Sequence, residues 1–378
     1  MKKIIVFNTD AYLDLNYNEK SKFKDYMNEW IGNGNKIVFT SHDNRKKTNL
    51  NDIEFNNSDK YFLNRFVLKE KIKSIGGNNF VLVGNKDIDL QLAANNKIFY
   101  ILPMWCNDRE DKPLKYGLRI KNLEQLNKLL KTINNQKNWF YKLELDEKTT
   151  ILSLTNANNY GASEKEDEMI NGFRNFLKKG DKQYYEVLLY HFLASISNKE
   201  EFRKIADWGI FPSSSVKINE DLSDFKEKAR ILMNGKKQEP IFIRHTATWK
   251  GHESWKHGKD RLPCDRHFDT IIIHNRYKNK LKGRVVCIFD DYLTNGTSFE
   301  TARNLLINEG VAHTYFVSLG KFHKNRVEQY LKQTYALNGD VSVRGYEYRK
   351  LSEEWFEGEF NTDAIQEIEN LHYIMFGN

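Results

Sequence analysis

The sequence predicts an α/β protein with two parallel β-sheets, each in its own part of the chain. Short apolar segments that end in polar residues alternate with helical patterns, which is typical of parallel sheets covered by helices. The chain has 378 residues, enough for two domains and a sizeable core. A polar, charged stretch at residues 138–149 separates the two alternating regions, so we expect domains at 1–137 and 150–378 joined by a linker.

Composition favours a folded protein of the cytoplasm. The chain contains 24 Phe, 19 Tyr and 7 Trp, an aromatic content that disordered segments lack. Its three cysteines, Cys106, Cys264 and Cys287, lie far apart, which indicates a reducing compartment rather than a disulfide scaffold. Residues 1–7 are too short for a signal peptide, and no apolar run approaches the length of a membrane span. We therefore expect no membrane partner.

The net charge is +8 and the isoelectric point is near 9. An excess of Lys and Arg favours anionic partners, either small phosphates or nucleic acid. No zinc-finger spacing, aromatic–basic RNA motif or helix-turn-helix pattern accompanies the charge, so a lysine-rich surface accounts for most of it. Nucleic acid therefore stays open as a partner without a motif, and a homodimer is compatible with the sequence.

Four strands are expected in the first domain, and each is followed by polar residues. They lie at residues 3–7, 36–39, 80–83 and 97–102, with helical patterns such as 19–31 between them. Ligands of parallel α/β sheets bind at the C-terminal ends of the strands. The polar residues there, among them Asp10, Thr40 and Asp89, are therefore candidate site residues.

The order of these polar residues resembles the haloacid-dehalogenase (HAD) phosphatases. That family has D-x-D after its first strand, Thr or Ser after the second, then a Lys and a G-D-x-x-x-D motif. The resemblance implies that Asp10 is the acid/base group, Thr40 the phosphate-binding hydroxyl and Asp89 the last acid. The lysine would be one of Lys69, Lys71 and Lys73.

Two amides depart from the HAD pattern. Asn8 stands where the family has its nucleophilic Asp, and Asn85 stands where it has a metal-binding Asp. An amide cannot form an acyl phosphate and brings no negative charge to Mg²⁺. We therefore expect a HAD-like domain that is inactive as a phosphatase and serves folding, binding or regulation. A generic Rossmann-like domain without that ancestry is the alternative.

In the second domain, a helical region at 164–206 precedes a short strand at 208–211. Further strands are expected at 240–244, 268–274, 285–289 and 311–319. Between 244 and 268 runs a basic, irregular segment whose length and glycines suit a mobile loop. Two alternatives for this loop are a nucleic-acid contact and a zinc site formed by His252, His257, Cys264 and His267.

The most informative stretch reads RVVCIFDDYLTNGTSFE, at residues 284–300. The apolar strand is followed by Asp290 and Asp291, then by a loop at 294–298, then by a helical pattern at 299–308. A helix N-terminus offers unpaired N–H groups to a phosphate, Gly296 lets the backbone approach it, and the loop hydroxyls add donors. The two carboxylates can accept hydrogen bonds from vicinal ribose hydroxyls. The stretch thus indicates a phosphorylated sugar; an ordinary strand, turn and helix with a capping Asp is the alternative.

This stretch resembles the phosphoribosyl-pyrophosphate (PRPP) signature of type I phosphoribosyltransferases. The pattern T-x-x-W-K-G…R that starts at Thr246 is similar to their competence-associated amidophosphoribosyltransferase-like branch. The resemblance implies transfer of phosphoribosyl from PRPP to an unknown acceptor base, with release of pyrophosphate and with Mg²⁺ as cofactor. Asp290 and Asp291 would hold the ribose, directly or through Mg²⁺. The 5′-phosphate would be held by Thr294, Asn295, Gly296, Thr297 and Ser298.

The same resemblance implies a pyrophosphate site and a hood. Pro212, Ser213 and Ser214, together with Arg244, resemble the family's pyrophosphate loop. Arg261 and Arg266 would clamp pyrophosphate, because a guanidinium binds phosphate as a fork. The tail at 346–378, rich in aromatics, or the helical region before the strand at 208–211 would supply the hood over the acceptor. Alternative functions are a PRPP- or nucleotide-sensing regulator without turnover, and a nucleic-acid-linked stress or phage-defence effector.

Overall fold

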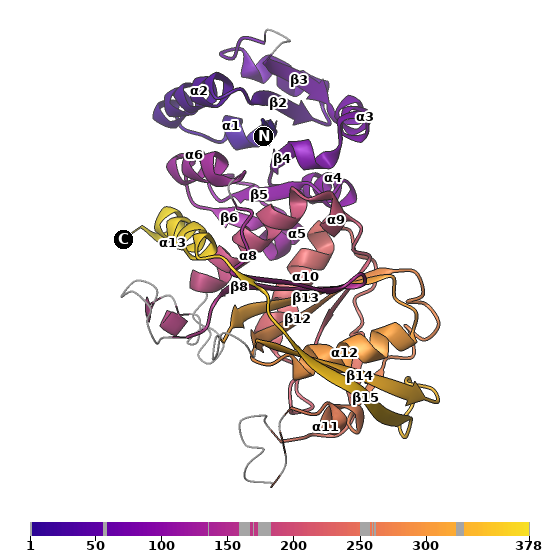
Figure 1. The fold of residues 1–378 in the computed structure, drawn as a ribbon. Helices are drawn as coiled ribbons and strands as arrows, with labels where there is room; N and C mark the ends of the chain where they lie inside the picture. The colour runs from indigo at the N-terminus through magenta and orange to yellow at the C-terminus, as the bar shows by residue number, and fades with distance from the viewer. Residues whose placement is uncertain are drawn as a thin grey trace.

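Two six-stranded sheets organise the chain, which is α/β as predicted (Figure 1). The computed structural model describes residues 2–55, 59–134, 136–158, 167–168, 170–172, 183–249, 258, 260, 262–322 and 329–377. In none of these residues does a helix have both the length and the apolar character needed to span a membrane.

Sheet A is fully parallel, with the strand order β3-β2-β1-β4-β5-β6. Its strands are β1 (Ile4–Asn8), β2 (Lys36–Ser41), β3 (Lys60–Asn64), β4 (Phe80–Val83), β5 (Phe99–Pro103) and β6 (Leu118–Ile120). The helices of this region are α1 (Asp10–Leu13), α2 (Tyr17–Gly32), α3 (Arg65–Ile75), α4 (Asp87–Asn95), α5 (Asp111–Tyr116) and α6 (Leu123–Thr132), with 3₁₀ turns at Asn44–Leu50 and Gly77–Asn79. All four predicted strands are present, and the edge strands β3 and β6 were not predicted.

Sheet B is mixed, with the order β16-β7-β8-β13-β12-β9. Its strands β8 (Thr149–Asn156), β13 (His313–Lys321), β12 (Val285–Leu293) and β9 (Asp207–Ile210) are parallel, whereas β7 (Tyr141–Asp146) and β16 (Glu359–Phe360) are antiparallel additions at one edge. Phe289 of β12 contacts helices α8 (Gln183–Ser197) and α10 (Glu220–Leu232) on one face. On the other face, Phe316 of β13 stacks on Phe299 of α12 (Thr297–Asn308) at 4.8 Å.

Two small sheets and three further helices complete the elements whose bounds lie within the described residues. Strands β10 (Phe242–Arg244) and β11 (Ile271–Ile273) pair with each other, as do β14 (Tyr330–Asn338) and β15 (Glu347–Phe356), and both pairs are antiparallel. The helices are α9 (Glu200–Arg203), α11 (Asp265–Phe268) and α13 (Asp363–Phe376). The strand expected at 240–244 therefore lies outside the main sheet.

Residues 138–149, which we expected to be a linker, contain strand β7. Tyr141, Leu143 and Leu145 are buried, while Lys142 and Glu144 between them are exposed. This period-two alternation is that of a strand with one solvent-facing side. The charged residues that indicated a linker lie on that side.

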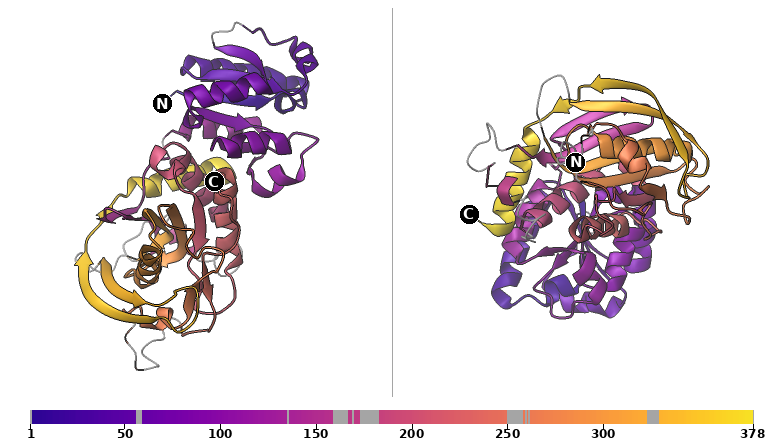
Figure 2. Two further views of the ribbon diagram at one scale, coloured as in Figure 1. Left: turned by 90° about the vertical axis from the view of Figure 1, so that its right-hand side faces the viewer. Right: turned by 90° about the horizontal axis from the view of Figure 1, so that it is seen from below.

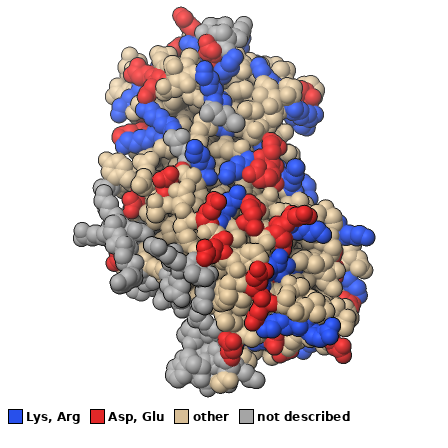
Figure 3. Space-filling view, viewed as in Figure 1, with Lys and Arg blue, Asp and Glu red and all other residues tan. Residues whose placement is uncertain are grey.

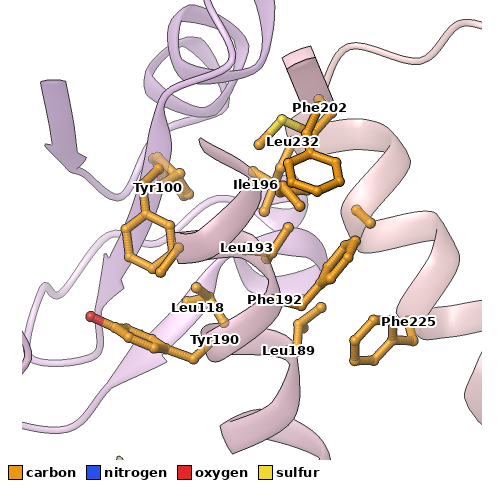
Figure 4. Packing of buried hydrophobic residues seen from close by; sticks show 14 of the residues in the cluster. Tyr100, Leu118, Leu189, Tyr190, Phe192, Leu193, Ile196, Phe202, Phe225 and Leu232 are labelled. Carbon is orange, nitrogen blue, oxygen red and sulfur yellow. The ribbon is translucent and has the colours of Figure 1, made fainter. Parts of the chain in front are cut away.

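Helix α8 belongs to the cores of both sheets. Figure 4 shows Tyr100 and Leu118 of sheet A close to Leu189 and Tyr190 of α8, and the buried residues of both sheets form one contiguous hydrophobic cluster. The Tyr190 ring lies 5.0 Å from that of Phe99. Helix α13 contacts both α6 and α8, so the tail expected over the acceptor places its helix between the sheets (Figure 2).

Polar contacts join the two regions as well. The Arg203 guanidinium donates to the carbonyls of Lys97 (2.7 Å) and Asn96 (2.9 Å), and the Lys97 ammonium donates back to the Arg203 carbonyl. The Gln125 amide donates to the carbonyl of Met375 at 2.8 Å. These bonds fix α9 and α13 against the elements of sheet A.

Candidate functional site

The candidate site lies at the C-terminal edge of sheet B, where β12 gives way to α12. β12 extends four residues beyond its predicted end and includes the acidic pair, with Asp290 opposite Ser318 and Leu293 opposite Lys321 of β13. Helix α12 starts at Thr297, two residues earlier than predicted, with Gly296 as its N-cap. The connecting loop is therefore short and held at both ends by regular structure.

Three successive carbonyls of this loop are bonded to the protein interior. The Leu293 carbonyl accepts from the Phe322 N–H (2.8 Å), that of Thr294 from the Lys321 ammonium (2.7 Å), and that of Asn295 from the Leu331 N–H (2.9 Å). In a trans peptide unit the N–H points away from the C=O. The N–H groups of residues 294, 295 and 296 are thus turned away from the interior, and none has an acceptor among the described residues.

The loop that carries these amides lines a cavity of about 360 Å³. It is lined by Leu262, Arg266, Asp290, Tyr292, Leu293, Thr294, Asn295, Gly296, Thr297, Ser298, Phe299 and Phe322. The structure thus brings together the predicted loop, Asp290 and Arg266. A row of outward N–H groups that leads into a helix N-terminus is a geometry that binds phosphate.

Lys321, a buried lysine at the end of β13, fixes the loop at 294–296 through a backbone carbonyl. It is 1% exposed, and its ammonium donates to the carbonyls of Thr294 (2.7 Å), Gln329 (2.9 Å) and Phe322 (3.1 Å). Burial lowers the pKa of Lys321 to about 7, whereas three carbonyl acceptors favour its charged form. Sequence reasoning missed this residue, for which the only signal is a lysine at the end of an apolar strand.

Gly296 allows the loop to pass over Tyr330. Its φ is +93°, and a Cβ at this position would lie 2.4 Å from the Tyr330 ring. The Tyr330 hydroxyl donates to the buried Glu300 carboxylate at 2.7 Å, and Arg303 binds that carboxylate as a fork. The ring therefore cannot move aside without breaking a buried polar network.

Asp290 and Asp291 are two adjacent carboxyl groups at the end of β12, and Asp290 lines the cavity. Both are half-buried, and the Asp291 N–H and the Ser298 hydroxyl donate to Asp290. Burial and the neighbouring Asp291 carboxylate raise the pKa of Asp290 well above its usual range. A cation or a hydroxyl donor would relieve this repulsion, so the pair fits Mg²⁺ or a ribose. The described residues contain no group of three or more His, Cys, Asp or Glu suited to a metal, so Mg²⁺ would need further oxygens from ligand and water.

A second loop with the same arrangement follows β9, the strand beside β12. The Pro212 and Ser213 carbonyls accept from the Arg244 guanidinium at 3.2 and 2.5 Å, and the Ser214 carbonyl accepts from the Thr248 N–H at 2.8 Å. The N–H groups of residues 213 and 214 are thus turned away from Arg244 and that of residue 215 from Thr248, and none of the three has an acceptor among the residues described. Two amide-presenting loops therefore flank the acidic pair.

Arg244 holds this loop, whereas we expected it to contact pyrophosphate. Its guanidinium also donates to the Thr270 hydroxyl (2.5 Å) and to His267 Nδ1 (3.1 Å), and the residue is 6% exposed. Burial and the charge of Arg266 lower the pKa of Arg244 to about 10. Arg244 is therefore a positioning residue in this structure, because its donors are directed at protein acceptors.

Other predicted site residues differ in role or lie beyond the description. The Thr297 hydroxyl donates to the Leu262 carbonyl at 3.0 Å rather than toward the cavity. Arg261 and part of the segment expected to be a mobile loop, residues 250–257, 259 and 261, lie outside the described residues, as do His252 and His257 of the zinc alternative. The other two residues of the zinc alternative, Cys264 and His267, are buried. The Cys264 thiol lies 3.6 Å from the Thr297 carbonyl.

The polar residues at the C-terminal edge of sheet A, which we call the sheet A cluster, bind one another or other protein groups. The buried Asp89 carboxylate forms an ion pair with Arg65 and accepts from the Asn8 amide and the Lys86 N–H. Burial raises the pKa of Asp89, and Arg65 and Asn8 oppose that rise. A guanidinium thus compensates the carboxylate that the HAD resemblance assigns as the last acid of its motif. Arg65 was not predicted, because it follows the unpredicted strand β3.

The other members of this cluster are also bonded within the protein. Asp10 forms an ion pair with Lys46 at 2.5 Å, and the Thr40 hydroxyl donates to the Leu63 carbonyl at 2.9 Å. The Asn85 amide donates to the Asp108 carbonyl at 2.7 Å, while its buried oxygen has no partner among the described residues. The expected lysines lie elsewhere, since Lys69 and Lys73 are exposed on α3 and Lys71 lies over the Tyr61 ring.

The sheet A cluster is expected to show no Mg²⁺-dependent phosphatase activity, and restoring its two carboxylates is expected to be insufficient. In the variant Asn8→Asp/Asn85→Asp, Arg65 still compensates Asp89, so Mg²⁺ binding should stay undetectable by calorimetry. Adding Arg65→Ala should make it measurable, whereas adding Arg45→Ala, an exposed arginine, should not. Hydrolysis of p-nitrophenyl phosphate by the unmodified chain, lost in Asp10→Ala, would contradict this expectation.

Comparison with protein families, with curated proteins and with solved structures finds no match for this chain. The two polar edges of the sheets differ in what they offer a ligand. The edge of sheet B has outward amides and a cavity, whereas the side chains of the sheet A cluster are directed mainly at one another.

Proposed function

We propose that the chain binds PRPP at the C-terminal edge of sheet B and transfers its phosphoribosyl group to a nitrogen nucleophile, releasing pyrophosphate. One observation carries the proposal: two loops on neighbouring parallel strands turn three successive carbonyls inward, with an acidic pair between them. PRPP has a matching layout, because its ribose hydroxyls lie between a 5′-phosphate and a pyrophosphate.

Each part of PRPP has a subsite in this arrangement. The amides of residues 294–298 and the N-terminus of α12 would bind the 5′-phosphate, and the amides of 213–215 would bind pyrophosphate. Asp290 and Asp291 would accept from the ribose hydroxyls and hold Mg²⁺, which when bound neutralises part of the pyrophosphate charge. Arg266, which lines the cavity, would add a guanidinium on the pyrophosphate side.

The reaction would be a displacement at C1 of the ribose. The C1–O bond to pyrophosphate breaks with its electron pair, the nucleophile's nitrogen forms the new bond, and the nitrogen's proton passes to solvent. Positive charge develops on the ribose ring beside Asp290 and Asp291, while the loop amides face the anionic groups. Placement and fixed charge therefore supply the catalysis.

The order of the strands in sheet B favours the β13 side of β12 as the place where the acceptor base binds. The pyrophosphate loop follows β9 on one flank of β12, whereas Phe322 follows β13 on the other flank. An in-line displacement needs the nucleophile opposite the leaving group, hence on the β13 side. The Tyr292 and Phe322 rings line the cavity there, 5.1 Å apart, and offer a face on which a planar base can stack.

The distribution of charged side chains does not favour nucleic acid as the ligand. Figure 3 shows Lys and Arg interspersed with Asp and Glu on the face drawn there, without a broad region of one sign. A regulator that binds PRPP without turnover would use the same site as the proposed enzyme. Release of pyrophosphate in the presence of a panel of nitrogen bases separates these two functions.

The double variant Asp290→Asn/Asp291→Asn is expected to bind PRPP–Mg²⁺ at least tenfold more weakly than the unmodified chain. The amides keep the shape of the carboxylates but lose charge-assisted hydrogen bonds, each worth roughly 1.5–3 kcal/mol. Isothermal titration calorimetry with PRPP and with ribose 5-phosphate measures the change, and Asp363→Asn, an exposed acid of α13, is the matched control. Equal PRPP affinity in the double variant and the control would overturn the assignment.

A further inference from the structure

The hairpin of β14 and β15 ends in a long unpaired edge. β15 has ten residues, most of them exposed, and within the described part of the chain it pairs with β14 alone. Leu351 at its centre is 54% exposed. Natural sheet edges are usually shortened, covered or uniformly charged, because an open edge recruits another strand.

The charges of β15 are arranged in two blocks of opposite sign. Arg349 and Lys350 precede the centre of the strand, and Glu353 and Glu354 follow it. In an antiparallel pairing of two copies about a point between Leu351 and Ser352, Arg349 lies opposite Glu354 and Lys350 opposite Glu353. Tyr348 then lies opposite Trp355. The sequence of this strand is therefore complementary to itself.

A β-bulge makes this register geometrically consistent. Residues that face each other across an antiparallel ladder must lie on the same face of the sheet. In a regular strand Lys350 and Glu353 would lie on opposite faces, because side chains alternate. The ladder between β14 and β15 shifts at Leu351, so Lys350 lies opposite Tyr335 while Glu353 lies opposite Gln333. Tyr335 and Gln333 share a face of β14, and Lys350 and Glu353 accordingly form an ion pair at 2.8 Å.

The same shift places the other charged pair on the second face. Arg349 lies opposite Ala336 and Glu354 opposite Lys332, and these two residues of β14 share the face opposite to that of Tyr335. Both charged pairs thus meet the same-face requirement in a single register. A bulge outside the segment between Lys350 and Glu353, or no bulge, would break this match.

We propose that two copies of this chain associate through their β15 strands, antiparallel and about a two-fold axis between Leu351 and Ser352. The product is a four-stranded sheet with the order β14-β15-β15′-β14′, crossed by two Arg349–Glu354 pairs and two Lys350–Glu353 pairs. The proposal does not depend on the proposed enzymatic function. It does connect to that site, because β14 packs on α12 (Figure 1) and its residue Tyr330 lies against Gly296 of the loop at 294–298.

Sedimentation-velocity analysis from about 1 to about 200 µM tests the proposal, because an interface made by one pair of strand edges is small and its association correspondingly weak. The unmodified chain is expected to show a reversible monomer–dimer equilibrium. Lys350→Glu places like charges opposite each other twice in each dimer and should weaken association at least tenfold. Lys350→Glu/Glu353→Lys restores complementarity on both sides of the axis and should restore the dimer to within about threefold.

Lys69→Glu makes the same charge change on α3 and should leave association unchanged, and circular dichroism verifies that each variant is folded. A monomer at every concentration would overturn the proposal. So would a dimer that is insensitive to Lys350→Glu, because the contact would then lie elsewhere. A dimer lost in the single variant and not recovered in the double variant would refute the proposed register.

Discussion

Replacing Gly296 with alanine is expected to weaken PRPP binding at least a hundredfold. The new Cβ would lie 2.4 Å from the Tyr330 ring, and the backbone has a φ of +93° that L-residues adopt only at a cost of roughly 1–2 kcal/mol. Tyr330 cannot yield, because its hydroxyl is bonded to buried Glu300. The loop must therefore shift and misdirect its amides. A hundredfold loss corresponds to about 2.8 kcal/mol of binding free energy.

Gly345→Ala provides a matched control for this prediction. Gly345 has a similar φ of +86°, and nothing lies within 4 Å of the position of its Cβ. It should therefore show the backbone strain without the clash and leave PRPP affinity unchanged in calorimetry. Thermal unfolding of both variants separates loss of binding from loss of the fold. Affinity within threefold of the unmodified chain in a folded Gly296→Ala variant would show that the loop amides do not contact the ligand.

Replacing Phe192 with alanine is expected to lower the free energy of unfolding by about 3–5 kcal/mol, as large aromatic truncations in a core do. The Phe192 ring contacts Trp139, Trp208, Phe225 and Phe289, all outside sheet A. Because α8 also packs on sheet A, amides of β5 should lose protection together with those of β13. Hydrogen exchange followed by mass spectrometry measures both strands in one experiment.

Phe23→Ala is the companion variant for this test. Phe23 packs on Phe7, Tyr12, Trp30 and Phe39, all within the region of sheet A. Both variants should destabilise the two sheets as one cooperative unit. Unchanged protection of β5 in Phe192→Ala would instead support two independently folding domains divided near residues 138–149, as the sequence suggested.

The sequence was most informative where local rules alone decide the structure. Short continuous apolar runs such as Phe80–Val83, bounded by polar residues, favour strands buried on both faces. The stretch from Val285 to Ser298 combines an apolar run, an acidic pair and a glycine turn in one segment. The α/β class and the components of the loop were therefore predictable. Strand β7 was missed because its charged residues outweighed the alternation of its apolar ones.

What escaped prediction depends on contacts between distant parts of the chain. Lys321 and Leu331 orient the loop through its carbonyls, and Arg244 and Thr248 do the same for the second loop. Arg65 neutralises Asp89 from the end of a strand that its sequence did not reveal. A contact between residues on distant strands has no signal in the periodicity or composition of the sequence. Only the folded structure therefore distinguishes a residue that can bind a ligand from one that positions the backbone.

The packing of α13 has a consequence for the order in which the molecule can be completed during translation. The Gln125 side chain and its partner, the Met375 carbonyl, are 250 residues apart, and at roughly 5–20 residues per second the ribosome needs about 10–50 s to make that interval. Throughout that time α6 lacks its contact with α13, and the face of sheet A that α8 covers is open until α8 (Gln183–Ser197) has been made. We therefore expect the first region of the growing chain to expose apolar surface until these later segments emerge, and such surface is what chaperones on nascent chains shield.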